Sequence, residues 1–140
     1  MTDVKPLNWE PVPGLGYNVE RRADGGMHYT FTELDDKTIQ HWQDFAHDHL
    51  LDADRLTRNL YDLRQVKDVP ESAIRVAVEV NSDPSARKIR LAVVVASEAV
   101  ANAIRKIAAL ASTESAAAMK IFTDIDEAEE WLSRPLDQIV

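Results

Sequence analysis

The sequence contains no cysteine, and this absence excludes several kinds of protein. A chain without thiols has no disulfide framework, no thiolate metal site and no cysteine nucleophile. No run of about 18 apolar residues is present, so we expect no membrane-spanning helix. The opening residues, MTDVKPLNWEPVPG, lack the apolar stretch of a signal peptide. Because disulfides are rare in reducing compartments, these features together predict a cytoplasmic protein.

Glycine is also scarce, with four residues at positions 14, 16, 25 and 26. None of them follows a parallel strand into a helix, which is where P-loop and Rossmann sites need a glycine-rich loop. The chain has no Gly-x-Ser-x-Gly elbow, and its helix-starting serines are explained as caps. We therefore predict no cofactor, no catalytic residue and no enzymatic activity.

The charge balance argues against a nucleic-acid partner. The chain has 16 basic and 24 acidic residues, which give a net charge of −8 and a surface that repels phosphate backbones. The densest basic patch, Arg87, Lys88 and Arg90, has no interleaved aromatic side chains. We interpret this patch as a solvated surface.

From Gly26 onward, apolar runs of strand length alternate with amphipathic segments of helix length. The predicted strands are 14–22, 27–33, 55–63, 88–96 and 116–123. The predicted helices begin at Asp35 or Asp36, at 70, at 98 and at 124, and end near 50, 80, 111 and 134. The order β-β-α-β-α-β-α-β-α predicts an α/β domain with a five-stranded, mostly parallel sheet, four helices and an antiparallel hairpin at one edge. We expect one domain over 14–134, an irregular leader over 1–13 and a short tail over 135–140.

Some segments allow sharper predictions. The continuous apolar run KIRLAVVVA, residues 88–96, predicts a strand that is buried on both faces. In the last helix, Trp131 and Leu132 are the expected anchors. Asp68, Pro70 and Glu71 predict a helix start with an acidic cap and proline in the first turn. The inner stripe of the third helix should comprise Val100, Ala103, Ile104, Ile107 and Leu110.

Three stretches carry a resemblance to a known family. They are Asp62-Leu63-Arg64 at the end of the third strand, LAVVVA at 91–96 before a helix, and IFTDIDEAEEWL at 121–132. The chain resembles the STAS-like superfamily, and within it the SpoIIAA-like branch, over roughly residues 14–134. The resemblance implies a SpoIIAA-like fold, a non-catalytic module that binds a protein partner, and a relation to Sec14-type lipid-binding domains.

In the regulated members of this family, a serine after the third strand is phosphorylated within the motif Asp-Ser-Ser-Gly-Leu. Counted from Asp62 without gaps, Ser72 takes the place of that serine, but Glu71 and Ala73 flank it and no glycine follows. A phosphate at a helix N-terminus is favoured by the helix dipole, whereas Asp68 and Glu71 would oppose it. We interpret Ser72 first as an ordinary first-turn residue.

The histidines do not make a convincing metal site. His41, Asp44 and Asp48 share one helix face at spacings i, i+3 and i+7, but the sequence offers no further strong ligand. A solvated polar face is the favoured interpretation, and we predict no bound metal. His28 lies in a predicted strand and is interpreted as a paired edge or surface residue.

Ligands of open α/β sheets bind at the carboxyl ends of the parallel strands. That edge is expected to gather Asp62, Arg64, Ser97, Thr123 and Asp124. Free amides at the helix starts and the guanidinium of Arg64 suit a small anion, a phosphate or a carboxylate of a partner. Alternatively, these residues cap helices and pair with one another.

The leading hypothesis is a cytoplasmic regulatory module that binds a protein partner, with Ser72 and the loop that starts at Asp62 in the interface. The runner-up is a carrier or sensor of a lipid or anion, which should show a cavity of several hundred cubic ångströms. An enzyme ranks third. The alanine-rich helix 99–111 would also allow a homodimer, although close packing on the sheet explains its small residues equally well.

Overall fold

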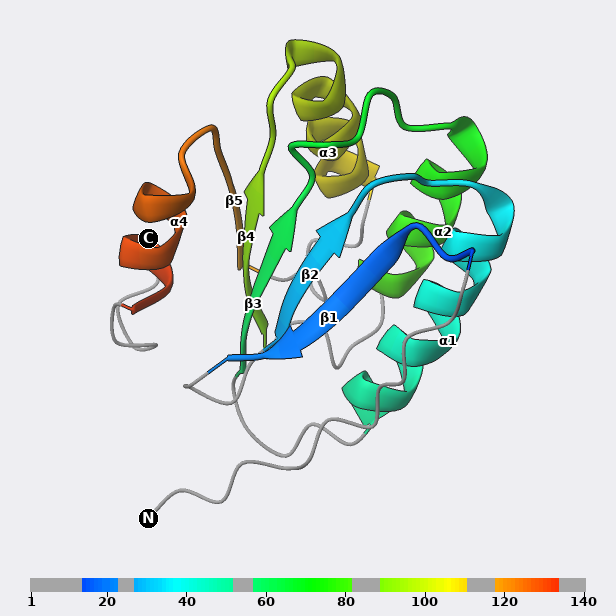
Figure 1. Ribbon diagram of the computed structural model, residues 1–140, viewed down its shortest axis with the longest axis horizontal. Helices are drawn as coiled ribbons and strands as arrows, with labels where there is room; N and C mark the ends of the chain where they lie inside the picture. Colours follow the sequence, from blue (N-terminus) through cyan, green and yellow to red (C-terminus); the bar gives the residue numbers. More distant parts are fainter. Residues whose placement is uncertain (1–13, 23–26, 52–56, 82–88, 111–117, 134–140) are drawn as a thin grey trace.

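The computed structural model describes residues 14–22, 27–51, 57–81, 89–110 and 118–133 (Figure 1). The predicted leader, tail and hairpin turn lie outside these residues. Within them the order of elements is the predicted one. The elements are β1 (Tyr17–Arg21), β2 (Met27–Phe31), α1 (Asp36–Leu51), β3 (Thr57–Asp62), α2 (Glu71–Asn81), β4 (Ile89–Val94), α3 (Glu98–Leu110), β5 (Ala118–Phe122) and α4 (Ile125–Ser133).

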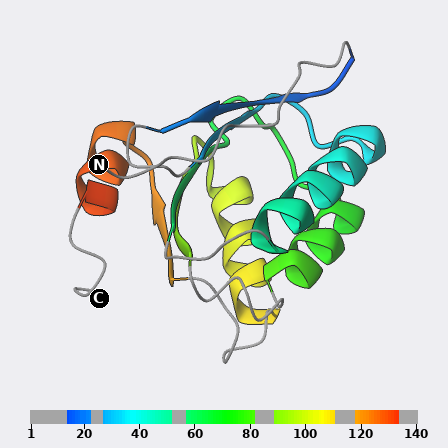
Figure 2. The ribbon, with the colours of Figure 1, turned by 90° about the horizontal axis from the view of Figure 1, so that it is seen from below.

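The five strands form one mixed sheet in the order β1-β2-β3-β4-β5. β1 pairs antiparallel with β2, and every other pair is parallel, which confirms the predicted fold class. Because consecutive parallel strands are neighbours, each crossover must return over the sheet through a helix. Figure 2 shows α1, α2 and α3 together on one face of the sheet and α4 alone on the other.

Side-chain and backbone caps fix the helix starts. Asp35 accepts a hydrogen bond from the Thr38 amide at 3.0 Å, and Ser97 accepts one from the Val100 amide at 3.3 Å. The prediction for α2 was wrong in one respect. The carbonyl of Pro70 accepts the first helical hydrogen bond, so proline precedes the helix as its cap residue. Asp68 is an exposed loop residue two positions earlier.

The main core lies between the sheet and helices α1–α3. It is rich in aromatic rings, with Tyr29 stacked on Tyr61 at a centroid distance of 4.3 Å. The Trp42 indole donates a hydrogen bond to the Tyr61 hydroxyl at 3.1 Å, which satisfies both polar groups. Burial raises the pKa of Tyr61, so its hydroxyl stays protonated and neutral within this layer.

The prediction for the stripe of α3 holds for most of its residues. Val100, Ile104 and Ile107 are buried, and Ala103 is half-buried against the same core. Leu110, however, is 58 % exposed, so its place in the stripe was wrong. It is the last residue of α3, three positions beyond Ile107, the last buried residue of that helix.

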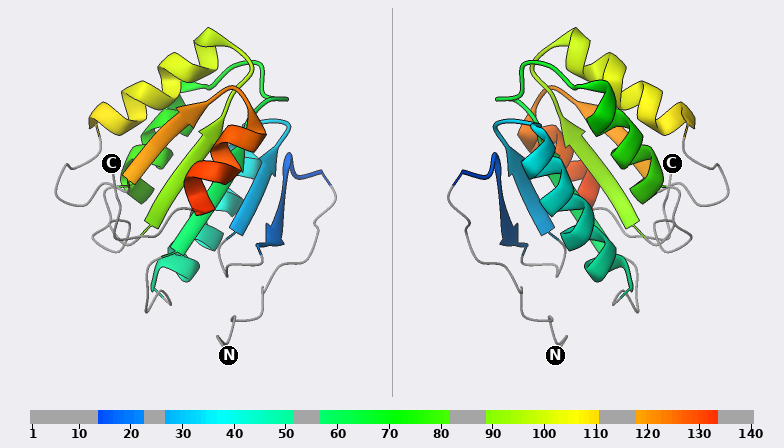
Figure 3. Two further views of the ribbon diagram at one scale, coloured as in Figure 1. Left: turned by 90° about the vertical axis from the view of Figure 1, so that its left-hand side faces the viewer. Right: turned by 90° about the vertical axis from the view of Figure 1, so that its right-hand side faces the viewer.

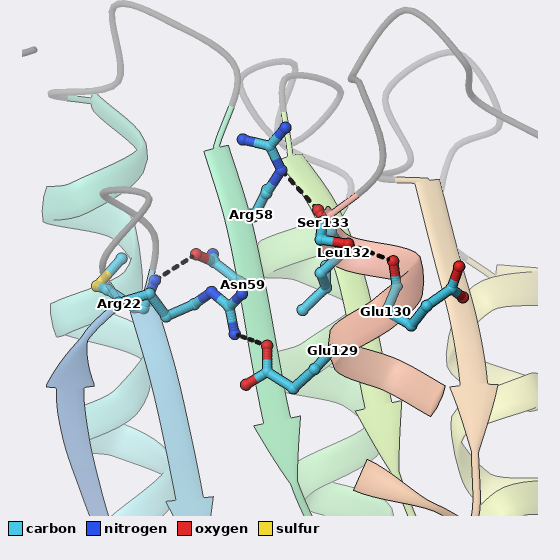
Figure 4. A network of polar contacts seen from close by, with 8 residues as sticks. Arg22, Arg58, Asn59, Glu129, Glu130, Leu132 and Ser133 are labelled. Carbon is cyan, nitrogen blue, oxygen red and sulfur yellow. Dashed lines mark hydrogen bonds and ion pairs between the residues drawn. The ribbon is translucent and has the colours of Figure 1, made fainter. Parts of the chain in front are cut away.

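A second, smaller core lies under α4. Trp131 and Leu132 are buried there as predicted, against Leu60 of β3 and Ala92 and Val94 of β4. β4 is therefore covered on both faces, as its apolar run indicated. Two polar ties hold α4 in place (Figure 4): Arg22 pairs with Glu129 at 2.6 Å, and the Arg58 guanidinium donates to the Leu132 carbonyl at 2.6 Å.

Leu110 of α3 and Leu132 of α4 provide a matched test of this packing. Leu132→Ala should lower the free energy of unfolding by about 2–5 kcal/mol, because it leaves a cavity in the core under α4. Leu110→Ala should cost less than about 1 kcal/mol, because that side chain is already largely in water. Urea unfolding measures both, and equal losses would contradict the assignment of the two environments.

Candidate functional site

The predicted site residues fall into three groups in the structure. Asp62 pairs with Arg64, whose pKa is also raised by the charge of Asp124, and Ser97 and Thr123 line a cleft. Ser72 lies in the first turn of α2, where its hydroxyl contacts the Asp36 carboxylate of α1 at 3.3 Å.

Asp62 and Arg64 form a two-pronged ion pair at the end of β3. Arg64 donates from Nε to Oδ1 at 2.9 Å and from a terminal nitrogen to Oδ2 at 2.8 Å, and its backbone amide adds a bond of 3.1 Å. These hydrogen bonds from Arg64 lower the pKa of the Asp62 carboxyl, and the nearby His28 lowers it further. The Arg64 guanidinium, which the sequence suggested as a donor to an anion, is therefore already bound by the carboxylate of Asp62.

Asp124 adds a second negative charge near Arg64. The hydrogen bonds with Asp62 are the main reason that the pKa of Arg64 is raised, and the charge of Asp124 raises it further. Asp124 also caps α4 by accepting a hydrogen bond from the Asp126 amide at 2.8 Å. Arg64 is therefore paired with Asp62 and also feels the charge of Asp124. The three residues carry a net negative charge, which suits a cationic partner group better than an anion.

The cleft lined by Ser97 and Thr123 is open to solvent and has a volume of about 660 Å³. Its floor is the carboxyl half of β5, Lys120–Phe122, followed by Thr123. One wall comes from α3 and the loop before it, and it comprises Ala96, Ser97, Glu98, Ala101 and Arg105. The other wall comes from α4 and comprises Glu127, Glu130 and Trp131. We call this feature the β5 cleft.

The two walls of the β5 cleft differ in charge. On the α3 wall, Arg105 donates to Glu98 at 2.9 Å and to Asn102 at 2.6 Å, so the opposite charges there compensate each other. The α4 wall presents the exposed carboxylates of Glu127 and Glu130. The only cation of β5 in the cleft lining is Lys120, whose ammonium lies 5.6 Å from the centre of the Phe122 ring. The α4 side is therefore the acidic side of the β5 cleft.

Sequence reasoning missed the β5 cleft, although one signal was available. Lys120 interrupts the apolar strand AMKIF, and a lysine within a strand is typical of a sheet edge. The element order alone did not place β5 at the edge, because the strand order of a parallel sheet is not read from the chain order.

The histidines behave differently from the sequence prediction. His28 on β2 is half-buried rather than a paired surface residue, and its Nε2 is buried without a hydrogen-bond partner. His41 shares a hydrogen bond of 2.6 Å with the Tyr17 hydroxyl, whose pKa is raised mainly by burial. Asp48, which shares the polar helix face of His41 and Asp44 in the sequence, belongs to the part of α1 whose side chains are not described. Among the described residues, no group of three or more metal-ligating side chains comes together.

An apolar cavity of about 70 Å³ lies inside the main core, between helices α1–α3 and the sheet. Phe31, Trp42, Leu63 and Ile104 are among the side chains around it. Its volume is far below the roughly 300–1,000 Å³ of typical small-molecule pockets. Of the helices that the structure describes, none combines the length and apolar character needed to cross a bilayer.

A five-stranded mixed sheet with three helices on one face and one on the other defines the class of this domain: it has a SpoIIAA-like fold. A solved structure with this architecture is an uncharacterised protein of the DUF3478 family from Shewanella loihica, described as having a SpoIIAA-like fold. The two chains are 16 % identical, the match covers 89 % of this chain and 98 % of that one, and the TM-score is 0.61. The likeness confirms the fold implied by the sequence resemblance.

No protein-family model matches the chain, and no curated protein matches it. At 16 % identity the structural likeness concerns the fold alone. The function must therefore be argued from the residues of the site.

The Asp62–Arg64 pair predicts a defined pH dependence. Because the pKa of Asp62 is lowered by folding, the pair stabilises the protein above the unfolded-state pKa of about 3.9, and this contribution is lost as the pH falls through the lower folded-state pKa. Asp62→Asn should cost about 1 kcal/mol at pH 7, a value reduced by the exposure of Arg64 to solvent.

Urea unfolding at pH 7 and pH 3 measures this effect. The difference between the native chain and Asp62→Asn should narrow at the lower pH. The control is Asp68→Asn, which removes an exposed loop carboxylate and should change stability little at either pH. A cost for Asp62→Asn that stays constant across this range would contradict the proposed role of the ion pair.

Proposed function

We propose that this protein is a non-catalytic, STAS-like regulatory module of the cytoplasm that binds a protein partner. The proposed interface is the carboxyl edge of the sheet together with the β5 cleft. It includes Asp62, Arg64, Ser97, Thr123 and Asp124, and it extends towards Ser72 at the start of α2. The fold, which other SpoIIAA-like proteins share, supports the proposal without identifying the partner.

The observation that carries the proposal is the β5 cleft itself. It is an open surface feature of about 660 Å³, whereas the cavity in the main core measures only about 70 Å³. Its lining combines apolar groups, such as Ile121 and Phe122, with charged residues along both walls. A mostly apolar centre within a charged rim is the common composition of protein–protein interfaces.

The state of the charged groups supports a binding role over a catalytic one. The lone pairs of Asp62 are taken up by three hydrogen bonds from Arg64, so this carboxylate is poorly placed to accept a proton from a substrate. The two tyrosines whose pKa values are raised, Tyr17 and Tyr61, owe the shift mainly to burial. Both belong to the main core or pack on it, and neither lines the β5 cleft.

The carrier hypothesis requires a cavity of several hundred cubic ångströms. The β5 cleft has that volume, but it is open to solvent and lined by charged side chains, whereas the pocket between the helices and the sheet, where a lipid would be enclosed, is too small. About 70 Å³ holds only a few atoms, and it lies among tightly packed aromatic and aliphatic side chains. We therefore expect native mass spectrometry of the purified protein to show no bound lipid. A stoichiometric lipid-sized adduct that survives buffer exchange would favour a carrier and would count against the proposed function.

Site-specific photo-crosslinking tests the proposed interface. A photoreactive phenylalanine analogue is placed at Ala96 or at Thr123, which lie on the α3 side and on the floor of the β5 cleft. In lysate of the native host, both positions should cross-link the same protein. The identical analogue at Gln40, an exposed residue of α1, is the matched control and should not cross-link it.

The captured protein is then purified and its binding measured directly. Thr123→Arg should weaken its affinity by about tenfold or more, because a long cation at this exposed floor residue would fill the cleft without touching the core. Gln40→Arg should leave the affinity unchanged. A partner that cross-links equally from Gln40, or no specific cross-link at either cleft position, would refute the proposed interface.

A further inference from the structure

β5 is the last strand of the sheet, and its hydrogen-bonding pattern shows which backbone groups it leaves available. The carbonyl of Phe122 accepts a hydrogen bond from the Val95 amide at 2.9 Å, so the peptide groups of Phe122 point towards β4. In an extended strand, successive residues direct their peptide groups to opposite sides. The amide and carbonyl of Ile121 therefore point away from the sheet. The Thr123 amide also points away, because it lies opposite the Phe122 carbonyl in the same trans peptide. The described residues provide no neighbouring strand on this side.

The β5 cleft lies directly over these outward groups. Four consecutive residues, 120–123, line it, so both faces and the outer edge of this stretch border the same space. Figure 3 shows β5 at the rim of the sheet, with α3 and α4 on opposite sides of it. An exposed strand edge between two helical walls has the shape of a slot for one extended chain.

Resting on the proposed function, we propose that the partner enters the β5 cleft as an extended segment and adds to β5 as a sixth strand. The outward amide and carbonyl of Ile121 and the outward amide of Thr123 bond to its backbone. Strand addition of this kind takes its affinity from main-chain hydrogen bonds and its specificity from alternate side chains. Residues 120–123, which line the cleft, span about 13 Å, so the paired part of the partner segment is about four residues long.

The lining of the β5 cleft defines the chemistry of this segment. Side chains on the α3 face meet Ile121, Ala101 and a charge-compensated ion pair, which favours apolar residues. Side chains on the α4 face meet Glu127, Glu130 and the Trp131 ring, and also Lys120, which shares this face with Phe122. Two carboxylates against one ammonium leave a net negative charge among these residues, which favours a lysine or arginine whose aliphatic stem packs on the aromatic surface. The segment that fits is thus one in which apolar and basic residues alternate.

Charge also distinguishes this segment from a second copy of the chain. Among the described residues, three carboxylates and two cations line the β5 cleft, and the whole chain carries a net charge of −8. Pairing β5 with β5 of another copy would bring Glu98, Glu127 and Glu130 close to their own counterparts. Such like-charge pairs oppose association, whereas a basic segment relieves the excess negative charge.

The test begins with a displayed library of random ten-residue peptides, selected against the full chain. We expect the enriched peptides to alternate apolar residues with lysine or arginine. One enriched peptide is synthesised, and amide hydrogen exchange is followed by NMR on the unmodified chain. The amides of Ile121 and Thr123 should exchange at least about tenfold more slowly in the complex, whereas those of Lys120 and Phe122, which already face β4, should change little.

A pair of variants tests the backbone directly. Ile121→Pro removes the outward amide while leaving the groups that bond to β4, and it should weaken peptide binding by about tenfold. Ile121→Val keeps the amide and the β-branched shape and should bind like the native chain. Because the exchange measurement uses the native chain, it decides the question even where the proline variant folds poorly.

The outcomes separate this inference from the proposed function. If peptides bind but the Ile121 and Thr123 amides stay unprotected, strand addition is wrong. The proposed partner interface is then decided by the cross-linking experiment alone. The proposal of a basic segment is also refuted if acidic peptides are enriched. It is refuted as well if no enriched peptide binds better than its scrambled version. Protection of both amides without peptide, rising with protein concentration, would show that a second copy occupies the β5 cleft.

Discussion

Burial of β4 on both faces is the constraint on which this architecture depends. Residues 91–95 are all apolar and at most 6 % exposed, and each large aliphatic side chain among them contributes about 1.5–3 kcal/mol when it leaves water. Alternate residues point to opposite faces, so a single layer of helices covers only half of this run. Right-handed crossovers place α1, α2 and α3 on one face, and the second face then requires α4. The contact of Leu132 with Leu60, Ala92 and Val94 is therefore a consequence of the composition of β4.

The same requirement produces the β5 cleft. β5 follows the last crossover, so it ends the parallel series with a neighbour on one side only among the described strands. The chain then crosses to the other face, because α4 has to reach the uncovered side of β4. As a result, α3 and α4 lie on opposite faces next to the same edge strand, and their side chains form two walls (Figure 3). The β5 cleft therefore follows from the arrangement of α3, β5 and α4.

How much the sequence predicts follows from the range of the interactions involved. Asp35, Ser97 and Asp124 each bond an amide within three residues, and such caps are visible in a short window of sequence. The apolar run of β4 and the anchors of α4 are equally local patterns. The strand order, the face chosen by α4 and the Arg22–Glu129 pair, which joins residues 107 positions apart, depend on the whole sheet. The sequence shows Lys120 as a charged residue within a strand. Its significance follows only from the position of that strand at the edge of the sheet.

The carboxyl edge shows why residue type alone does not define a site. A guanidinium at the end of a parallel strand suggested an anion site, yet Asp62 already pairs with Arg64 and the charge of Asp124 adds to it, which reverses the preference. The neighbouring α4 wall has the same sign, because α4 carries Asp126, Glu127, Glu129 and Glu130 within nine residues. Asp126 and Glu127 lie in the first turn and favour the helix start through its dipole. Glu127 and Glu130, with Trp131, give the β5 cleft an acidic, partly aromatic wall. A free strand edge would ordinarily invite pairing with any sheet. Two helical walls and a lysine on the strand limit access here to one narrow segment, and the acidic wall makes that segment a basic one.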